Sequence, residues 1–327
     1  MDTFTNLKNN FPRLEKDILL KNYSTFRIGG PAKYFLRTSD KKELKKAIEL
    51  ANKENIKFLV IGGGSNILFS DNGFDGLVIV YKSENLSKEN LTIEKREEGE
   101  NVIIKVDTSI PLSFLISELK NLSGLEWGVG IPGTLGGAIN GNAGALGESI
   151  SNLIESVDVI DVSSGDVLEK KMKRKDCFFA YRTSIFKNNS DLLVVSAELK
   201  LSKDKEEEVK KRIIDNLDKR RAKNPKGFSA GSVFKNYYGK LEENILDSYP
   251  QLKNFNDKGI IPTGLLIELC GLKGKKIGGA KISEEHANFI INLENATSAD
   301  VMSLINLAKK SVKEKFLIDL SEEIKFF

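Results

Sequence analysis

The sequence predicts an α+β protein with more than one domain. Four segments carry apolar residues at helical spacing, and six short apolar runs typical of strands lie between them. The chain has 327 residues, which is more than one ordinary hydrophobic core accommodates. Its 40% hydrophobic and 29% charged residues are typical of a soluble globular protein.

The helical segments are spread along the whole chain, at residues 40–55, 111–122, 205–222 and from about 298. Pro111 suits the first turn of the second helix and Gly124 its exit. Thr297 is the expected N-cap of the last helix. The residues expected to face inward are Leu44, Ala47, Ile48, Ala51, Val209, Ile213, Leu217, Val301, Leu304, Ile305, Ala308 and Val312.

The strand-like runs occupy residues 58–61, 77–81, 102–106, 157–162, 192–199 and 289–293. The long charged helix that precedes Asn224 and Pro225 indicates a seam between two halves of the chain. No internal repeat is visible.

Charge and composition exclude several classes of protein. The net charge is +4, and acidic residues alternate with basic ones over residues 204–221, unlike the basic face of a nucleic-acid-binding protein. One histidine, His286, and two cysteines, Cys177 and Cys270, are too few for a zinc site or a disulfide framework. Both cysteines are expected to be buried small hydrophobes. No apolar run is long enough to span a membrane, and the polar N-terminus lacks a signal core, so the expected location is cytoplasmic.

A first glycine-rich loop follows the strand at 58–61. Three consecutive glycines permit positive φ and a close approach of backbone N–H groups to an anion. Extended chain follows the loop, whereas a dinucleotide-binding Rossmann turn leads directly into a helix. A tight turn without a ligand is the alternative. The candidate cofactor-binding residues here are Ile61, Gly62, Gly63, Gly64, Ser65 and Asn66.

A second glycine-rich segment runs from Gly128 to Ala145. It contains a formal G-x-G-x-x-G pattern, but Pro132 interrupts it and no buried strand precedes it, which argues against a Rossmann fold. So many small residues favour close contact between backbone and a large, flat or phosphorylated ligand. The candidate cofactor-binding residues here are Gly130, Pro132, Gly133, Thr134, Gly136, Gly137, Ala138, Asn142, Ala143 and Gly144.

Six motifs occur in order along the chain. They are residues 22–32 (NYSTFRIGGPA), 61–66 (IGGGSN), the 130–145 segment, the YRTS sequence at 181–184, 229–236 (SAGSVFKN) and 286–292 (HANFIIN). Together they resemble the UDP-N-acetylenolpyruvoylglucosamine reductase family (UDP-N-acetylmuramate dehydrogenases). The resemblance covers nearly the whole chain, from about Tyr23 to Phe327, and departs from the family in an apparent insertion at about residues 237–262.

The resemblance implies a fold and two cofactors. The fold is a two-part FAD-binding domain of the vanillyl-alcohol-oxidase/PCMH type, followed by an α+β substrate domain. The implied boundaries are residues 1–83 and 84–220 for the two FAD-binding parts and 221–327 for the substrate domain. A reductase needs a redox cofactor, because no side chain carries hydride chemistry. The resemblance implies that this cofactor is FAD and that NADPH reduces it.

The resemblance also implies a reaction of peptidoglycan precursor synthesis. Hydride passes from flavin N5 to the β-carbon of UDP-N-acetylglucosamine enolpyruvate, and a proton then reaches the α-carbon to give UDP-N-acetylmuramate. By resemblance, Arg182 stabilises the enolate, Ser232 donates the proton and Glu323 acts as a neutral acid whose pKa burial should raise. A surface ion pair, a turn serine and a solvated glutamate are the alternatives, with Glu322 adjacent.

Four residues are candidates for binding the substrate. Tyr181 is expected to line the pocket beside Arg182, and the diphosphate is expected to meet Lys223, Lys235 and Asn236. Trp127 and His286 are expected to support packing. No metal ligand and no nucleic-acid partner are expected, and the oligomeric state is left open.

Two other functions compete with this one. One is another non-covalent FAD oxidase or dehydrogenase of the same fold, because the FAD half lacks the histidine that often attaches flavin covalently. The other is a non-catalytic flavin-binding or nucleotide-sugar-binding protein, which would not need Arg182, Ser232 and Glu323 together.

Overall fold

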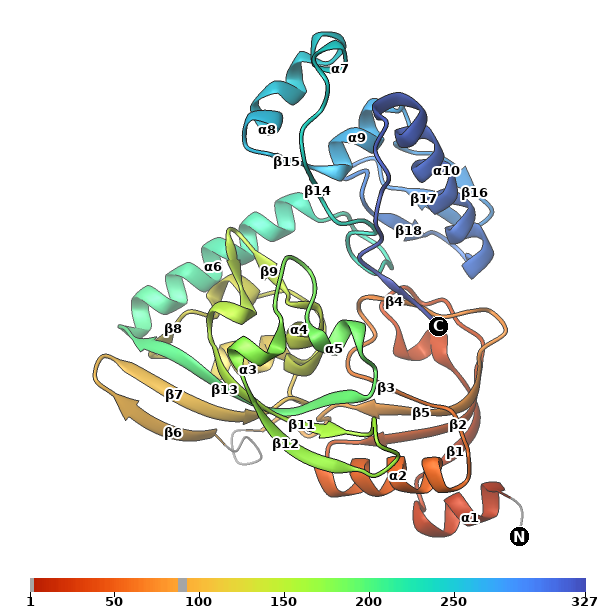
Figure 1. Ribbon diagram of the computed structural model, residues 1–327, viewed down its shortest axis with the longest axis vertical. Helices are drawn as coiled ribbons and strands as arrows, with labels where there is room; N and C mark the ends of the chain where they lie inside the picture. The colour runs from red at the N-terminus through yellow and green to blue at the C-terminus, as the bar shows by residue number, and fades with distance from the viewer. Residues whose placement is uncertain (1–2, 88–92) are drawn as a thin grey trace. The chain divides into compact units, whose positions relative to one another are not determined.

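The computed structural model describes residues 3–87 and 93–327 (Figure 1). The chain folds into two compact units. Unit 1 comprises residues Met1–Ile18, Ala32–Gly63 and Asp75–Ala222, and unit 2 comprises Leu19–Pro31, Gly64–Phe74 and Lys223–Phe327. Two short N-terminal segments therefore belong with the C-terminal part of the chain.

The helices confirm the predicted pattern and add shorter ones. The α-helices are α1 (Thr3–Asn10), α2 (Lys41–Lys53), α3 (Leu112–Glu118), α4 (Leu135–Gly141), α5 (Ile185–Asn188), α6 (Glu206–Lys223), α7 (Glu243–Ser248), α8 (Lys253–Asp257), α9 (Thr263–Leu269) and α10 (Ser298–Phe316). The short 3₁₀ turns are η1 (Leu20–Tyr23), η3 (Glu126–Gly128), η4 (Ile150–Asn152), η5 (Arg174–Cys177) and η6 (Pro250–Leu252).

The strands form several separate sheets. They are β1 (Glu15–Leu19), β2 (Pro31–Thr38), β3 (Phe58–Ile61), β4 (Ile67–Leu68), β5 (Phe74–Tyr81), β6 (Ile93–Glu98), β7 (Asn101–Asp107), β8 (Leu122–Ser123), β9 (Gly144–Ala145), β10 (Glu148–Ser149), β11 (Ile154–Asp161), β12 (Leu168–Lys173), β13 (Leu192–Lys203), β14 (Tyr237–Tyr238), β15 (Ile260–Ile261), β16 (Lys276–Ile277), β17 (Ala280–Ile282), β18 (Ile290–Asn292) and β19 (Lys325–Phe326).

The smaller sheet of unit 1 has four strands in the order β1-β2-β5-β3. Strands β3 and β5 run parallel, with Ile61 opposite Val80. Helix α2 begins where the Asp40 side chain accepts a hydrogen bond from the Lys42 N–H, and its apolar face is buried as predicted. The first glycine loop therefore starts at the C-terminal end of a well-packed strand.

The larger sheet of unit 1 has six strands in the order β12-β11-β13-β7-β6, with β8 also paired to β13. Its neighbouring strands are antiparallel throughout. One hydrophobic cluster joins this sheet to α3, α4 and α5, and it contains Val106, Leu115, Ile139, Phe186 and Ala197. The second glycine-rich segment, which leads into and forms α4, is thus anchored on this sheet.

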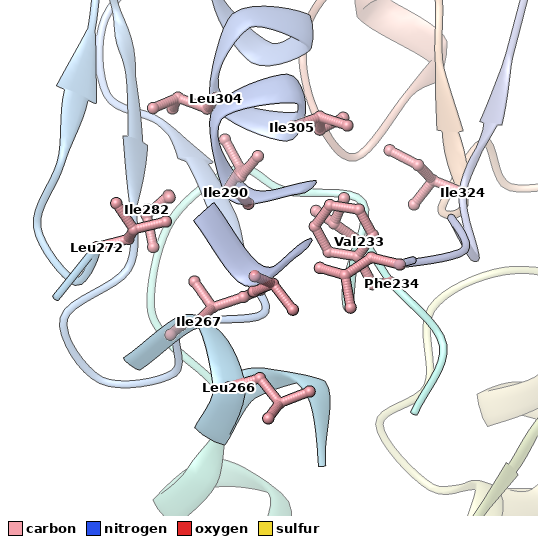
Figure 2. Packing of buried hydrophobic residues seen from close by; sticks show 14 of the residues in the cluster. Val233, Phe234, Leu266, Ile267, Leu272, Ile282, Ile290, Leu304, Ile305 and Ile324 are labelled. Carbon is pink, nitrogen blue, oxygen red and sulfur yellow. The ribbon is translucent and has the colours of Figure 1, made fainter. Parts of the chain in front are cut away.

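The core of unit 2 surrounds the antiparallel sheet β16-β17-β18 and the long helix α10. A capping box between Thr297 and Asp300 begins α10, as the sequence predicts for Thr297. Figure 2 shows how side chains of α9, α10 and the sheet meet Val233, Phe234 and Ile324 in this core. In the apparent insertion, strands β14 and β15 pair with each other in antiparallel orientation, with Tyr237 opposite Ile261.

All four predicted helices and all six predicted strands are present, with three differences. Helix α3 ends at Glu118 because residues 122–123 pair with β13 as strand β8. Ile213 and Leu217 are half-buried, whereas Val209 on the same helix is buried. Cys177 is buried as expected, but Cys270 is only half-buried.

Two features of the described residues concern membranes and metals. None of the helices within residues 3–87 and 93–327 combines the length and the apolar character needed to cross a membrane. Within the same ranges, no group of three or more His, Cys, Asp and Glu side chains is arranged to hold a metal ion.

Candidate functional site

The two glycine-rich loops touch each other within unit 1. A Cβ added to Gly63 would lie 2.6 Å from the Cα of Gly133, and one added to Gly62 would overlap Oγ1 of Thr134. Such close backbone contact is possible only because these positions lack side chains. The predicted cofactor-binding residues Ile61, Gly62 and Gly63 therefore adjoin the predicted residues of the second loop.

The second loop is held from both sides by backbone hydrogen bonds. The Leu112 N–H donates to the Gly133 carbonyl (3.0 Å), and the Gly136 N–H donates to the Thr108 carbonyl (2.9 Å). Gly130 and Gly133 have φ values of +73° and +116°, which favour glycine. Oγ1 of Thr134 caps α4 by accepting from the Gly137 N–H (3.2 Å). This loop is therefore a fixed surface that leads into a glycine-rich helix.

One observation at this surface fits an expected FAD. The contacts of Gly62 and Gly63 with the second loop are a requirement of the fold, because side chains there would overlap Thr134 and Gly133. Trp127 is only 5% exposed, and its indole N–H has no hydrogen-bond acceptor among the described residues. A buried donor of this kind calls for an acceptor, which a polar ligand can supply.

The remaining residues of the first loop lie in unit 2. Gly64 has a φ of +60°, and the Thr25 N–H donates to its carbonyl (3.1 Å). The Asn66 side chain donates to the Glu323 carbonyl (3.1 Å), and the Lys325 N–H donates to the Asn66 carbonyl (3.0 Å). Asn66, predicted to bind cofactor, thus also fixes the backbone on both sides of Ile324. Ser65 lies between the two residues.

The end of α4 connects the second loop to the YRTS motif. Asn142 terminates the helix in the left-handed conformation, with a φ of +45°. Its buried side chain donates to the Ala180 carbonyl (2.8 Å) and accepts from the Ser151 N–H (3.2 Å). Ser184 is buried and donates to the Asn140 carbonyl (2.7 Å). These contacts give Asn142 a structural role beside its predicted cofactor role.

Arg182 is held at the tip of a tight turn in unit 1. Ala180 and Thr183 exchange two backbone hydrogen bonds of 3.1 Å, which leaves Tyr181 and Arg182 at the corner. The φ of Arg182 is +54°, an uncommon conformation for a bulky residue and one found more often at functional sites. Its Nη2 donates to the Gly144 carbonyl (2.6 Å), and its guanidinium lies 5.3 Å from the Tyr181 ring centroid.

Gly144 permits this placement of the arginine. A Cβ there would lie 3.1 Å from Nη1 of Arg182 and would overlap the Glu148 carbonyl across the β9–β10 hairpin. The predicted residues Gly144, Tyr181 and Arg182 are therefore brought together in one place. Ala143, the neighbouring prediction, packs against the hydrophobic cluster of the larger sheet.

Ser232 and Glu323 are brought onto neighbouring segments in unit 2. The Glu323 N–H donates to the carbonyl of Val233, the residue after Ser232 (2.7 Å), and the Lys235 N–H donates to the Ser321 carbonyl (2.9 Å). On its other side, Ser232 forms a β-bridge with Phe289. Gly231 has a φ of +80°, which permits the turn into the motif.

Glu322 and Glu323 are adjacent half-buried residues in unit 2. Glu322 forms an ion pair with Lys309 of α10 at 2.8 Å. Glu323 is half-buried and lies between backbone contacts to Val233 and Asn66. The ion pair thus joins the Glu322 carboxylate to α10.

The predicted substrate-binding residues fall in both units. Tyr181 adjoins Arg182 in unit 1 and is 36% exposed. In unit 2, Lys223 is exposed at the end of α6, and Lys235 and Asn236 are half-buried. The backbone and side chain of Thr263 hold the last two, through the Asn236 side chain (3.3 Å) and the Lys235 carbonyl (2.6 Å).

Two positioning residues were not predicted from the sequence. Asn288 brackets Phe234 in the serine motif, accepting from its N–H (3.0 Å) and donating to its carbonyl (2.8 Å). Arg220 of α6 donates to the carbonyls of Val129 (2.9 Å) and Trp127 (3.3 Å) in the second glycine segment. Asn288 could have been predicted, because it lies in the 286–292 motif. Arg220 could not, because it is one of many charged residues in the sequence of α6.

Trp127 and His286 have the packing positions expected of them. Trp127 is buried in the cluster around the larger sheet. The His286 ring packs edge-on against Phe289, with centroids 4.9 Å apart, and its Nδ1 accepts from the Asn288 N–H (3.2 Å). Burial is the main cause that lowers the pKa of His286, so it is neutral at pH 7.

Comparison with known proteins defines first the class of fold. Residues 32–170 match the family model described as the FAD binding domain. The pattern of helices and strands agrees, so the α+β class and the FAD-binding type of the predicted fold are confirmed. Residues 223–327 match the model for the C-terminal domain of UDP-N-acetylenolpyruvoylglucosamine reductase.

Relatives that match over the full length identify the family. The chain is 38% identical to the UDP-N-acetylenolpyruvoylglucosamine reductase of Protochlamydia amoebophila, covering 95% of this chain and 93% of the relative. It is 37% identical to that of Prochlorococcus marinus, covering 96% and 97%. The chain therefore belongs to the UDP-N-acetylenolpyruvoylglucosamine reductase family, as the resemblance implied.

A solved structure agrees with this assignment. The UDP-N-acetylenolpyruvylglucosamine reductase of Thermus caldophilus is 30% identical to this chain, with a TM-score of 0.72. The match covers 96% of this chain and 99% of the Thermus chain.

Proposed function

We propose that this protein reduces the enolpyruvyl double bond of UDP-N-acetylglucosamine enolpyruvate, with FAD as cofactor and NADPH as reductant. The product is UDP-N-acetylmuramate, an intermediate of peptidoglycan precursor synthesis. One hydride adds to the β-carbon and one proton to the α-carbon, and NADPH is oxidised to NADP⁺. Family membership over at least 95% of the chain supports this reaction.

The observation that carries the proposal is that the backbone segments of Ser232 and Glu323 are hydrogen-bonded to each other in unit 2. A 2.7 Å hydrogen bond from the Glu323 N–H to the Val233 carbonyl places the two side chains on adjacent segments, although they are 91 positions apart. A non-catalytic binding protein has no need for a serine and a glutamate on hydrogen-bonded neighbouring segments. Their juxtaposition supports a proton-delivering pair.

Ser232 donates the proton to the α-carbon of the substrate in this proposal. A serine hydroxyl is a weak acid, so transfer depends on the basicity of the enolate and on the groups around the serine. Glu323, acting as a neutral acid, stabilises the charge that develops on the substrate. The turn at Gly231 and the β-bridge to Phe289 orient Ser232 for this step.

Arg182 binds the substrate carboxylate and stabilises the enolate. Its planar fork suits a carboxylate, and its hydrogen bond to the Gly144 carbonyl fixes one arm of the guanidinium. A preorganised positive charge of this kind is effective where negative charge develops during a reaction. The uncommon backbone conformation of Arg182 supports a functional role.

FAD supplies the hydride chemistry that amino-acid side chains lack. The residues proposed to hold it are those of the two glycine loops, which meet at the Gly62–Thr134 and Gly63–Gly133 contacts. Tyr181, Lys223, Lys235 and Asn236 are proposed to bind the substrate, the three residues of unit 2 at its diphosphate. The exposure of Lys223 and Tyr181 supports access to a ligand.

Location, partners and domain boundaries are further parts of the proposal. We place the reaction in the cytoplasm, where the unpaired state of Cys177 and Cys270 suits a reducing environment. The nucleotide sugar is the proposed partner, with no nucleic acid. The division at residues 1–83, 84–220 and 221–327 stays a prediction; the C-terminal family match beginning at residue 223 supports its last boundary.

Substitution of Ser232 tests the function directly. Ser232→Ala should lower substrate-dependent NADPH oxidation by about 10²–10⁴-fold, because a positioned proton donor is lost. FAD should remain bound, and NADPH should still bleach the flavin absorbance. Ser303→Ala, an exposed serine on α10, is the control.

Three outcomes would decide between the parts of this proposal. Full turnover by Ser232→Ala would exclude the role of that serine. Wild-type protein that binds FAD but oxidises no NADPH with the enolpyruvyl sugar would refute the reaction. Protein that does not bind FAD would refute the proposed cofactor.

A further inference from the structure

Arg220 is a half-buried cation on a helix that is otherwise mainly exposed. Helix α6 buries one residue, Val209, and most of its side chains face solvent. Arg220 instead turns to the second glycine segment, where Nε donates to the Val129 carbonyl (2.9 Å) and Nη2 donates to the Trp127 carbonyl (3.3 Å). A Cβ at Gly130 would lie 3.0 Å from its Cδ, so the loop lacks a side chain where the arginine passes.

Arg220 has no carboxylate partner among residues 3–87 and 93–327, whereas nearby arginines of the same helix do. Arg212 is paired with both Glu126 (2.9 Å) and Asp204 (2.5 Å), and Arg221 lies 3.8 Å from Asp218. The two hydrogen bonds of Arg220 go to neutral carbonyls, which orient the guanidinium without cancelling its charge. A partly buried cation without a counter-charge is costly and marks a place where an anion is stabilised.

A second positive charge acts on this arginine. Burial is the main cause that lowers the pKa of Arg220, and the charge of Arg182 lowers it further. Separate backbone carbonyls fix the two guanidiniums, that of Gly144 for Arg182 and those of Trp127 and Val129 for Arg220. Strand β9, which contains Gly144, contacts η3, which contains Trp127, so the carbonyls that hold the two guanidiniums belong to neighbouring segments of unit 1. Two positive charges on neighbouring segments are an arrangement that an anionic ligand relieves.

Trp127 connects Arg220 with the second glycine segment. Its carbonyl accepts from Nη2 of Arg220, while its own buried N–H donates to no described group. That indole N–H is the donor considered above for FAD, so the charge left without a counter-charge at this turn is that of the Arg220 guanidinium.

We propose that Arg220 is a second anion-binding residue, which binds the enolpyruvyl carboxylate of the substrate together with Arg182. The inference rests on the proposed function, because that function identifies the anion held by Arg182 as this carboxylate. Two oxygens of one carboxylate can accept from two guanidiniums, and two positive charges stabilise the enolate better than one. Arg220 then favours substrates that carry a carboxylate over nucleotide sugars that lack one.

The test compares two ligands on the oxidised, FAD-loaded protein by the change in flavin absorbance. UDP-N-acetylglucosamine enolpyruvate has the carboxylate, and UDP-N-acetylglucosamine has the same diphosphate without it. Arg220→Gln should weaken binding of the enolpyruvyl compound by about tenfold or more, the loss typical of a hydrogen bond to a charged group. Binding of UDP-N-acetylglucosamine should change by less than about twofold, within the effect of ordinary surface substitutions.

Two further variants control for charge and for folding. Arg221→Gln removes the same charge from the adjacent, exposed position and should leave both affinities unchanged. Arg220→Lys keeps the charge, so it should recover part of the affinity for the enolpyruvyl compound. It also keeps the inference testable if Arg220→Gln fails to fold.

The possible results separate this inference from the proposed function. Equal weakening of both ligands, or loss of FAD alone, would show that Arg220 only clamps the Trp127–Gly130 turn, and would overturn the inference. Equal weakening by Arg221→Gln would overturn it as well. Wild-type protein that binds the two ligands equally would instead refute the proposed substrate, before any variant is considered.

Discussion

Replacement of Gly63 by alanine should separate the two glycine loops and weaken FAD binding. The added Cβ would lie 2.6 Å from the Cα of Gly133, whereas carbon atoms in ordinary contact are about 3.5–4.0 Å apart. The loops must therefore move apart by about 1 Å. The neighbouring atoms belong to backbone, so no side-chain rotation can relieve the overlap.

The size of the effect follows from the cost of overpacking. Forcing an extra methyl group into a packed region costs about 1–3 kcal/mol. If FAD binding requires the closed arrangement of the loops, its Kd should rise by about 5- to 150-fold. Titration of flavin-free protein with FAD, followed by flavin fluorescence, measures this change directly.

A general loss of stability is separated from this effect by Gly99→Ala. Gly99 lies between β6 and β7, has a φ of +64° and has no atom within 4 Å of an added Cβ. Alanine there is strained by about 1–2 kcal/mol without any overlap. Gly99→Ala should therefore lower the Tm and leave FAD affinity unchanged. Wild-type FAD affinity in Gly63→Ala would refute the proposed role of the loop contact.

Two further predictions concern stability. Asn288→Ala removes both hydrogen bonds to the buried Phe234 backbone and should lower the free energy of unfolding by about 2–4 kcal/mol, measured by urea denaturation, because two polar groups lose their partner; a loss no greater than that of Asn224→Ala, at an exposed position, would contradict this. The hydrogen bond from Lys170, together with those from Ser163, lowers the pKa of Asp161 to about 2, from an ordinary value of 3.8. The stabilisation by Asp161 is therefore complete above about pH 4 and is lost as the pH falls toward 2, so the difference in Tm between wild type and Asp161→Asn should vanish over that interval; a constant difference in Tm from pH 6 to pH 2 would contradict the assignment.

Local patterns predicted the principal elements correctly because those elements depend on nearby residues. The inward face of α2, the N-cap at Thr297 and strand β3 follow from spacing and capping within a few residues. Helix α4 was missed because Gly136, Gly137 and Gly141 disfavour a helix by about 1 kcal/mol each. Its backbone contacts to Thr108 and Ile110, far away in the sequence, stabilise it instead.

The candidate site also combines residues that the sequence predicts with contacts that it does not predict. The motifs contain Arg182 and Ser232, and the resemblance indicated Glu323 near the end of the chain; the family resemblance is confirmed. Their roles stay predictions. The supporting contacts were not predictable, since neither the Asn66 bond to the Glu323 backbone nor the Arg220 bonds to the second loop have a local pattern.

The sequence by itself determined the α+β class, the family and the order of the motifs, because each is encoded in short stretches whose spacing and chemistry can be read directly. Only the tertiary structure decided that residues 19–31 and 64–74 pack with the C-terminal part of the chain, that Glu323 adjoins the serine motif, and that Arg220 has no carboxylate beside it among the described residues. These features depend on contacts between residues that lie tens to hundreds of positions apart. Burial and charge compensation at such contacts are properties of the folded chain as a whole, which no local pattern records.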